Sequence, residues 1–130
     1  MALVSITRLR VRSARFAPAF IWYAMRSINQ ARHSQGCLAA DVRREKALVF
    51  WTRTAWTDLA AMRAFMGSGA HRTVMPKLMD WCDEASLVHF EDETGNVPDW
   101  EEAAIKVRDN GRTSRVRHPS AAHVRGQTVS

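Results

Sequence analysis

The sequence predicts an α+β fold whose elements follow the order β-α-β-β-α-β and build a four-stranded antiparallel sheet. Three observations predict it. A strand-like opening precedes a long run of apolar residues at helical spacing. Two strand-like runs then flank a charged triplet, and a helix broken at Gly67–Gly69 leads into a last apolar strand. We expect one domain over residues 1–91, with a C-terminal extension over residues 92–130.

The first strand is expected over Ala2–Arg12, which is rich in Val, Ile, Leu and Thr and partly alternates with polar residues. Arg8, Arg10 and Arg12 stand at every second position, so they share one face of this strand. That pattern predicts either a solvated face or the rim of a pocket for an anion. A helix follows over Pro18–Arg32, because apolar residues recur at helical spacing and proline fits the first turn.

Two neighbouring strands are expected at Gly36–Arg43 and Ala47–Thr54, joined by the polar turn Arg44–Lys46. The run Ala47–Trp51 is apolar without alternation, which indicates burial on both faces of the sheet. One layer of helices can cover only one face. We therefore expect a second copy of the chain to cover the other, and the protein to be a homodimer.

The second helix is expected to begin after Asp58, a favourable N-cap residue, and to break at Gly67–Gly69. It restarts near His71, with Pro76 predicting either a kink or a late start. The last strand is expected over Ala85–Glu91. These elements complete the predicted βαββαβ order.

The extension should hold one short helix and a basic tail. Residues 98–109 begin with a proline, carry acids in the first turn and bases in the last, and stop at an Asn-Gly pair. Residues 112–130 show no periodicity and give the chain much of its formal net charge of +6. This tail lacks the aromatic residues that stack on the bases of single-stranded nucleic acid. We therefore expect the tail to be solvated or to clamp onto the protein chain, rather than to form a nucleic-acid site.

The two cysteines, Cys37 and Cys82, match neither a metal-ligand spacing nor a disulfide framework. We interpret them as buried, reduced thiols of a cytoplasmic protein. The longest apolar stretch, Phe16–Met25, is about half the length of a membrane span, so no membrane segment is expected. No metal site and no cofactor-binding motif is expected either.

His71 and Arg72 are the candidate catalytic residues. A histidine near a helix N-terminus is held neutral by the partial positive charge there and can act as a general base, while Arg72 can hold an oxyanion. The structural alternative is that His71 only caps the broken helix. Trp22, Trp51 and His89 are candidate ligand-pocket residues, with core packing as the alternative for the two tryptophans and a structural role for His89.

The order of elements, the long first helix, the break before His71 and the ending Trp81…Leu87-Val88-His89-Phe90 resemble the dimeric α+β barrel superfamily. The likeness covers residues 2–91 and is nearest to its antibiotic-biosynthesis-monooxygenase-like branch, with an aromatic phrase around Trp51 similar to the spheroidene-monooxygenase-like members. It implies a ferredoxin-like fold, a homodimer, and a pocket between sheet and helices. Many oxygenases of this superfamily use no metal or organic cofactor.

The haem-degrading branch of this superfamily carries an Asn on the first strand, where this chain has only Ser5 and Thr7. The resemblance therefore does not imply haem. It favours a cofactor-independent, monooxygenase-like enzyme acting on a small apolar or aromatic compound. The alternatives are a non-catalytic ligand-binding or assembly protein on the same scaffold and, more remotely, a nucleic-acid-binding tail.

Overall fold

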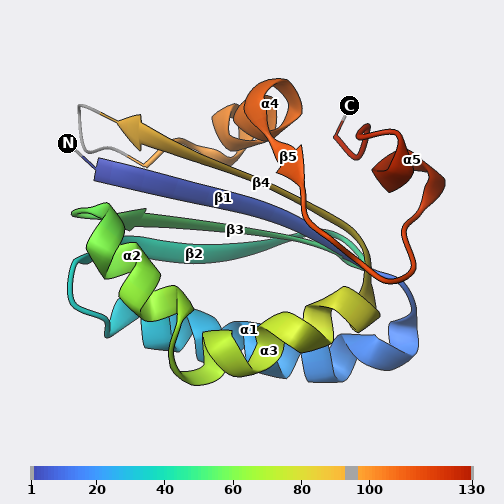
Figure 1. The fold of residues 1–130 in the computed structure, drawn as a ribbon, viewed down its shortest axis with the longest axis horizontal. Helices are drawn as coiled ribbons and strands as arrows, with labels where there is room; N and C mark the ends of the chain where they lie inside the picture. Colours follow the sequence, from blue (N-terminus) through green and yellow to red (C-terminus); the bar gives the residue numbers. More distant parts are fainter. Residues whose placement is uncertain (1, 93–96, 130) are drawn as a thin grey trace.

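A single antiparallel sheet stands at the centre of the molecule. The computed structural model of the chain describes residues 2–92 and 97–129. The helices that precede residue 82 cover one face of the sheet, and the chain from residue 97 on covers much of the other face (Figure 1). Up to residue 92 the elements follow the predicted β-α-β-β-α-β order, with the second helix in two pieces.

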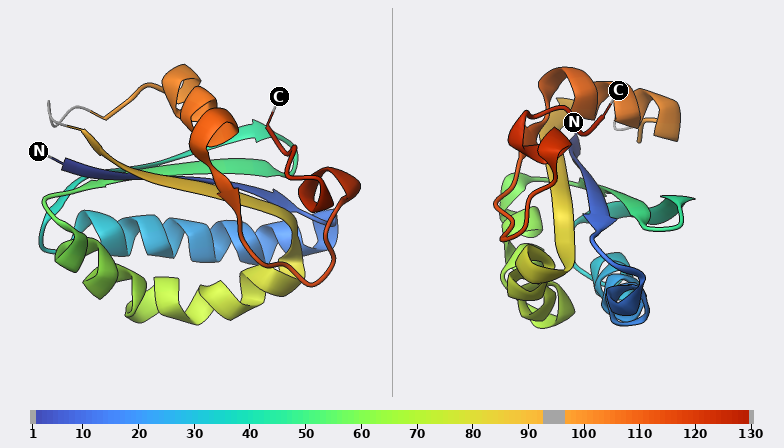
Figure 2. Two further views of the ribbon diagram at one scale, coloured as in Figure 1. Left: turned by 45° about the horizontal axis from the view of Figure 1, so that its top comes forward. Right: turned by 90° about the vertical axis from the view of Figure 1, so that its right-hand side faces the viewer.

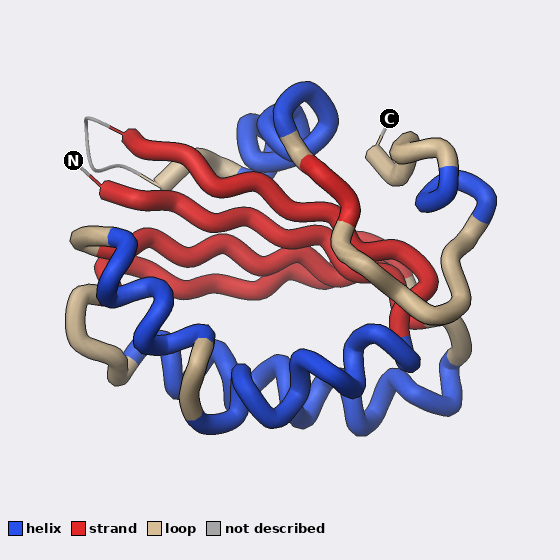
Figure 3. Tube along the Cα trace, viewed as in Figure 1, coloured by secondary structure: helices blue, strands red, loops and turns tan. Residues whose placement is uncertain are grey.

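The strands and helices are shown in Figure 3. The strands are β1 (Ala2–Val11), β2 (Cys37–Lys46), β3 (Val49–Trp56), β4 (Cys82–Asp92) and β5 (Arg112–Thr113). A short 3₁₀ turn, η1 (Ala14–Phe16), precedes the helices α1 (Ala17–Arg32), α2 (Leu59–Met66), α3 (Gly69–Trp81), α4 (Trp100–Asn110) and α5 (Ala121–Val124). Within the described ranges, no helix combines the length and the apolar character needed to cross a bilayer.

The sheet has the strand order β2-β3-β1-β4-β5, and every pair of neighbours is antiparallel. The predicted α+β fold class is therefore confirmed, together with the extra C-terminal helix. The sheet has five strands rather than four, because Arg112 pairs with Leu87 at the outer edge of β4. Two residues are too few to show a strand period, so the sequence could not reveal β5.

The hairpin between β2 and β3 turns later than expected. The charged residues Arg44–Lys46 continue β2, and the turn lies at Ala47-Leu48. Because β2 is an edge strand, its charged side chains can remain in water while its backbone stays paired. The Arg44 side chain also donates to the Ala47 carbonyl, at 2.7 Å from Nη2, and so braces the turn.

Local capping sets the helix boundaries, and the cap at Asp58 is the expected one. Asp58 accepts a hydrogen bond from the Ala61 backbone N–H at 2.8 Å and begins α2. Gly69, with a φ of 58°, begins α3 after the break. Pro76 lies inside α3 and does not delay its start. In the C-terminal extension, Asp99 accepts from the Glu102 N–H at 2.8 Å and begins α4.

The face of the sheet away from α1–α3 is covered by the chain itself, which corrects the reason we gave for a homodimer. Val4, Ile6 and Trp51 point to this face and are at most 5% exposed. Ala103 and Val107 of α4 pack directly against them. Figure 2 shows α4 lying across the strands on this side. We call this surface the closed face. The apolar run around Trp51 is buried on both sides, as predicted. On the closed face, however, α4 covers it rather than a second copy of the chain.

The arginine row on β1 also differs from the solvated face suggested above. Arg8 is only 8% exposed and lies on the closed face, where its Nη1 donates to the Glu84 carboxylate at 2.7 Å. Arg10 donates to the same carboxylate at 3.3 Å, and the Ser120 hydroxyl donates to it at 2.7 Å. A buried charge needs a partner of opposite charge, and Glu84 supplies it from β4. The same carboxylate ties the C-terminal segment to the sheet.

Candidate functional site

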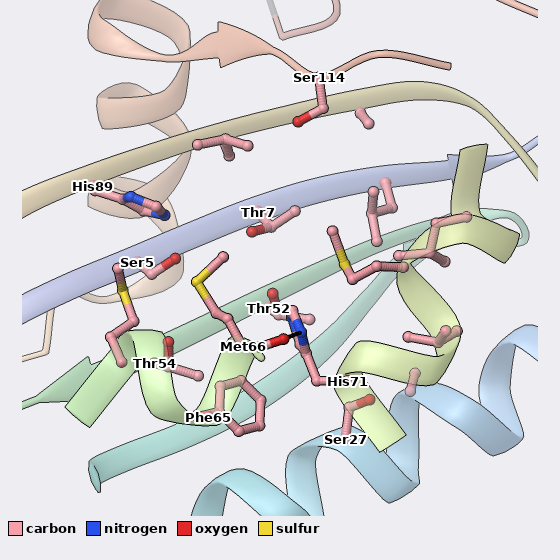
Figure 4. A pocket seen from close by; sticks show the side chains of 18 of the residues that line it. Ser5, Thr7, Ser27, Thr52, Thr54, Phe65, Met66, His71, His89 and Ser114 are labelled. Atoms are coloured by element: carbon pink, nitrogen blue, oxygen red, sulfur yellow. Dashed lines mark hydrogen bonds between the residues drawn. The ribbon is translucent and has the colours of Figure 1, made fainter. Parts of the chain in front are cut away.

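A cavity of about 240 Å³ lies between the sheet and the helices α1, α2 and α3. Its volume is somewhat below the ~300–1,000 Å³ of pockets for drug-sized ligands, so it favours a compact molecule. Figure 4 shows the side chains that surround it, with the strands on one side and the helices on the other. We call the sheet surface under the cavity the cavity face.

Four hydroxyl groups form the floor of the cavity. Ser5 and Thr7 on β1 stand directly opposite Thr54 and Thr52 on β3 in the antiparallel ladder, and all four line the cavity. Alternation along the strands sends them to the cavity face while Val4 and Ile6 go to the closed face. None of the four hydroxyls has a hydrogen-bond partner among the described residues, so they can donate to or accept from a ligand. We call them the hydroxyl floor.

The walls of the cavity are apolar and rich in flexible side chains. They include methionine side chains, whose thioether groups adapt to irregular shapes. These walls therefore suit a flat or irregular apolar molecule. Trp56 is fully buried, and its ring stacks on Phe65 at 5.1 Å between centroids. Neither its indole Nε1 nor the Ser27 hydroxyl, both at the cavity lining, has a hydrogen-bond partner among the described residues. The principal wall residues come from α1, α2 and α3 and are Phe20, Met62, Phe65, Val74, Met75 and Leu78.

His71 lines the cavity at the start of α3. Its Nδ1 lies 3.2 Å from the carbonyl oxygen of Met66, as the dashed line in Figure 4 marks. A carbonyl can only accept, so Nδ1 carries the proton and Nε2 keeps a free lone pair. Burial lowers the pKa of His71 below its ordinary 6.5, although the Met66 carbonyl opposes this. The ring is therefore neutral at pH 7, as a general base requires.

Gln30 holds His71 in place, and the sequence did not reveal it. Its Oε1 accepts from the His71 backbone N–H at 3.0 Å. Its Nε2 donates to the carbonyl oxygens of Ser68 at 2.9 Å and Phe65 at 3.3 Å. One side chain on α1 thus satisfies backbone groups on both sides of the break between α2 and α3. No local pattern predicts this contact, because 41 residues separate Gln30 from His71.

His89 also lines the cavity, from β4, next to Ser5 in the ladder. It is exposed at the edge of the cavity rather than enclosed. Burial of part of its ring, and then the positive charge of Arg112, lower the pKa of His89 below its ordinary 6.5. Arg112 reaches this place because β5 brings it beside Leu87. The structure thus brings His71 and His89 to one cavity.

The other candidate residues lie elsewhere. Arg72 is exposed and is not among the residues that line the cavity in the described parts of the chain. Trp51 lies on the closed face, where its Nε1 donates to Glu45 at 3.2 Å. Trp22 is 54% exposed on α1, with the Arg26 guanidinium 4.7 Å from its ring centroid. Strand alternation sends Trp51 away from the cavity, and helix rotation sends Trp22 to the solvent side of α1.

No three His, Cys, Asp or Glu side chains of residues 2–92 and 97–129 form a group that could hold a metal ion. Both cysteines are free. Burial, and to a lesser extent the Asp83 carboxylate, raise the pKa of Cys82 to about 12. Cys37 is only half-buried, contrary to the expectation that both cysteines are buried, and its partial burial still raises its pKa. Because both thiols stay protonated at neutral pH, neither is an activated nucleophile.

A protein family described as a domain of unknown function, DUF3291, matches residues 4–116. The match therefore extends from β1 past β5, across the whole cavity. None of the curated proteins matches this chain.

Solved structures share the fold at low sequence identity. A conserved protein from Methanosarcina mazei Go1 has a TM-score of 0.64 at 16% identity, covering 72% of this chain and 94% of that one. SnoaB, a cofactor-independent oxygenase from Streptomyces nogalater, has a TM-score of 0.61 at 17% identity, covering 75% of this chain and 98% of that one. A structure described as an antibiotic biosynthesis monooxygenase has a TM-score of 0.62 at 16% identity, covering 74% and 99%.

These likenesses confirm the predicted resemblance to antibiotic-biosynthesis-monooxygenase-like proteins at the level of the fold. At such identities they do not carry an activity or a substrate over. Each of those chains is covered almost whole, whereas about a quarter of the present chain is not covered. This chain therefore adds residues of its own to the shared fold.

Proposed function

The chain belongs to the DUF3291 family, and we propose that it is a cofactor-independent, monooxygenase-like enzyme that oxidises a small apolar or aromatic compound in the cavity. The observation that carries the proposal is the state of His71. Its Nδ1–H donates to the Met66 carbonyl, so Nε2 keeps a lone pair that can accept a proton in an apolar cavity. The fold shared with a cofactor-independent oxygenase supports the same reaction class.

The proposed reaction converts an activated CH₂ group of the substrate into a ketone. Nε2 of His71 removes one proton, and the resulting carbanion transfers electrons to O₂ as a C–O bond forms. His71 returns the proton to the peroxide, which loses water together with the second hydrogen of the carbon. One oxygen atom of O₂ ends in the ketone and the other in water, so the substrate supplies both electron pairs and no further reductant is consumed.

The hydroxyl floor has a binding role in this proposal. The hydroxyls of Ser5, Thr7, Thr52 and Thr54 hold phenolic or carbonyl oxygens of the substrate and so orient its reacting carbon toward His71. Arg72, which we expected to stabilise an oxyanion, is exposed and away from the cavity lining, so we assign that part to floor hydroxyls instead. The apolar walls exclude water and strengthen the electrostatic interactions inside.

Oxygen uptake tests the proposal. Purified protein should consume O₂ with at least one member of a panel of hydroxyaromatic ketones that carry an activated CH₂ group, and His71→Ala should lower the rate by about 10²-fold or more. His33→Ala is a matched control, because His33 is exposed and its Nδ1 also lies near a carbonyl oxygen of its own helix end, that of Asn29, at 2.7 Å. Bound panel compounds without oxygen uptake would instead support a non-catalytic ligand-binding protein.

The homodimer and the cytoplasmic location belong to the same proposal. The fold is the one that the resemblance associates with paired chains, but α4 already covers the sheet face that a second copy was expected to cover. A partner would therefore dock on α4 or on another surface, such as the exposed apolar side chains of α1. Sedimentation at micromolar concentration tests the dimer, and a well-behaved monomer would rule it out.

A further inference from the structure

The start of the C-terminal segment (residues 112–129) forms part of the cavity wall, through Arg112, Ser114, Arg115 and Val116. β5 pairs with β4 through Arg112 and Leu87. The Ser114 N–H then donates to the Ala85 carbonyl at 2.8 Å, and the Arg117 N–H donates to the Met79 carbonyl at 2.8 Å. In Figure 2 this segment runs past β4 toward the end of α3 before it returns to α5. These backbone bonds fix where its side chains stand.

Two cations of this segment, Arg112 and Arg115, line the cavity. Arg112 faces it because its ladder partner Leu87 lies on the cavity face, in the same row as Thr7 and Thr52. Arg112 on β5 therefore lies next to Leu87 on β4, and β4 separates it from Thr7 on β1. With strands ~4.8 Å apart, Arg112 is about two strand spacings from the hydroxyl floor. Both arginines are exposed at the outer edge of the cavity, which leaves them open to an entering molecule.

The charge of these two arginines is not compensated. No Asp or Glu among the described residues lines the cavity. Neither guanidinium has an ion pair or hydrogen bond within residues 2–92 and 97–129. Arg8 and Arg53, by contrast, are each paired with a carboxylate, at 2.7 Å and 3.2 Å. An apolar cavity with two free guanidinium groups at its edge is complementary to a molecule that is apolar at one end and anionic at the other.

We infer that the cavity binds an apolar carboxylic acid, with its carboxylate on Arg112 and Arg115 and its apolar body over the hydroxyl floor toward His71. This inference rests on the proposed function only in that it names the substrate class of the same cavity. A guanidinium can bind a carboxylate through two parallel hydrogen bonds, and the Ser114 hydroxyl at the same edge offers another donor. The acid group would thus set which end of the molecule reaches His71.

Matched acids and amides test the inference by binding alone, without turnover. Benzoate, naphthalene-2-carboxylate and decanoate are titrated into the full chain by calorimetry, each beside its neutral primary amide. At least one acid should bind about tenfold or more tightly than its amide, because charged hydrogen bonds are stronger than neutral ones. Arg112→Gln/Arg115→Gln should remove this preference and leave the amide affinity unchanged. Arg117→Gln, a change to an exposed arginine of the same segment outside the cavity lining, should leave both affinities unchanged.

Salt gives a second readout on the wild-type chain. Raising NaCl from 0.05 M to 0.5 M should weaken the acid and not the amide, because exposed charges are screened. The inference is overturned if no acid binds more tightly than its amide, or if the double variant keeps the preference. Such a result leaves the oxygen-uptake experiment intact, since the panel of ketones used there is neutral. Loss of oxygen uptake with a retained acid preference would instead remove the proposed enzyme and keep the binding site.

Discussion

The two faces of one sheet differ in almost every property, although the same strands build both. The closed face carries Val4, Ile6 and Trp51, which α4 buries. The cavity face carries Ser5 and Thr7, whose hydroxyls have no partner among the described residues. Neighbouring residues of β1 therefore serve different ends. The closed face contributes to stability through tight packing. The cavity face packs less tightly, because it keeps a cavity with free polar groups.

The charged groups of the two faces differ in the same way. On the closed face, Arg8 and Glu84 are buried and bonded to each other at 2.7 Å. On the cavity side, Arg112 and Arg115 are exposed, and no Asp or Glu of the described residues lines the cavity beside them. The paired charges on the closed face hold the fold together, whereas the unpaired charges beside the cavity are those to which we assign a ligand.

The largest effect is expected on the closed face, from Glu84→Gln. This change leaves the buried Arg8 without its counter-charge, and such a loss costs about 3–5 kcal/mol of unfolding free energy. Urea denaturation at pH 7 measures it. The double variant Arg8→Met/Glu84→Leu should cost less than Glu84→Gln alone, because it leaves no buried charge at this pair. A loss under about 1 kcal/mol in Glu84→Gln would mean that Arg8 is already hydrated.

Two adjacent residues of β1 compare the faces directly. Ile6→Ala removes a side chain that is 0% exposed and should cost about 2–5 kcal/mol. Thr7→Ala, on the cavity face, should cost under about 1 kcal/mol, because it removes no packed apolar group and only some strand preference. Both are measured by urea denaturation at one pH. Equal losses at the two positions would contradict the division of the sheet into a packed face and an open one.

A smaller effect is expected at the helix break on the cavity side. Gln30→Ala removes the bonds to His71, Ser68 and Phe65 and should cost about 1–2 kcal/mol. Because these bonds hold the start of α3, the imidazole resonances of His71 should also shift in an NMR spectrum. Asn29→Ala, one residue earlier on the exposed side of α1, is the control and should change neither. Unchanged His71 resonances in Gln30→Ala would mean that the start of α3 keeps its position without Gln30.

The smallest effect separates the two faces by pH. On the cavity side, burial lowers the pKa of His71 and of His89. At mildly acidic pH, these two histidines bind more protons in the unfolded chain than in the folded chain. The free energy of unfolding should therefore fall as the pH drops below about 6.5. His71→Gln/His89→Gln should flatten this part of the curve of unfolding free energy against pH. An unchanged slope in the double variant would contradict the pKa directions.

The closed face should respond only in a more acidic range. Although burial alone would raise the pKa of Glu84, the bonds from Arg8 and Ser120 outweigh it and lower the pKa below its ordinary 4.5. Its contribution to stability is therefore present above pH 4.5 and is lost as the pH falls through the folded-state value. Asp83, whose pKa burial raises, acts in the opposite direction. The difference between the wild type and Glu84→Gln isolates the part due to Glu84 and should shrink below pH 4.5.

Local sequence patterns are enough to predict most of the helices and strands of this chain. The apolar period of α1, the Asp58 and Asp99 caps and the glycine break before His71 each depend on residues within one or two helical turns. Alternation in β1 likewise separates the residues of the two faces. The order of these elements was enough to predict the α+β fold, and His71 stood out because it follows the break.

The segments that cover each face of the sheet, and the side chains that complete the cavity, follow from long-range contacts in the folded chain. The pair Arg8 and Glu84 spans 76 residues, and Gln30 reaches His71 across 41. On the closed face, α4 takes the place of the expected second copy. Trp51 packs there against α4 and does not line the cavity. Arg112 reached the cavity through a two-residue strand. Each of these contacts joins segments far apart along the chain, and their positions depend on packing in space, which residue spacing does not encode.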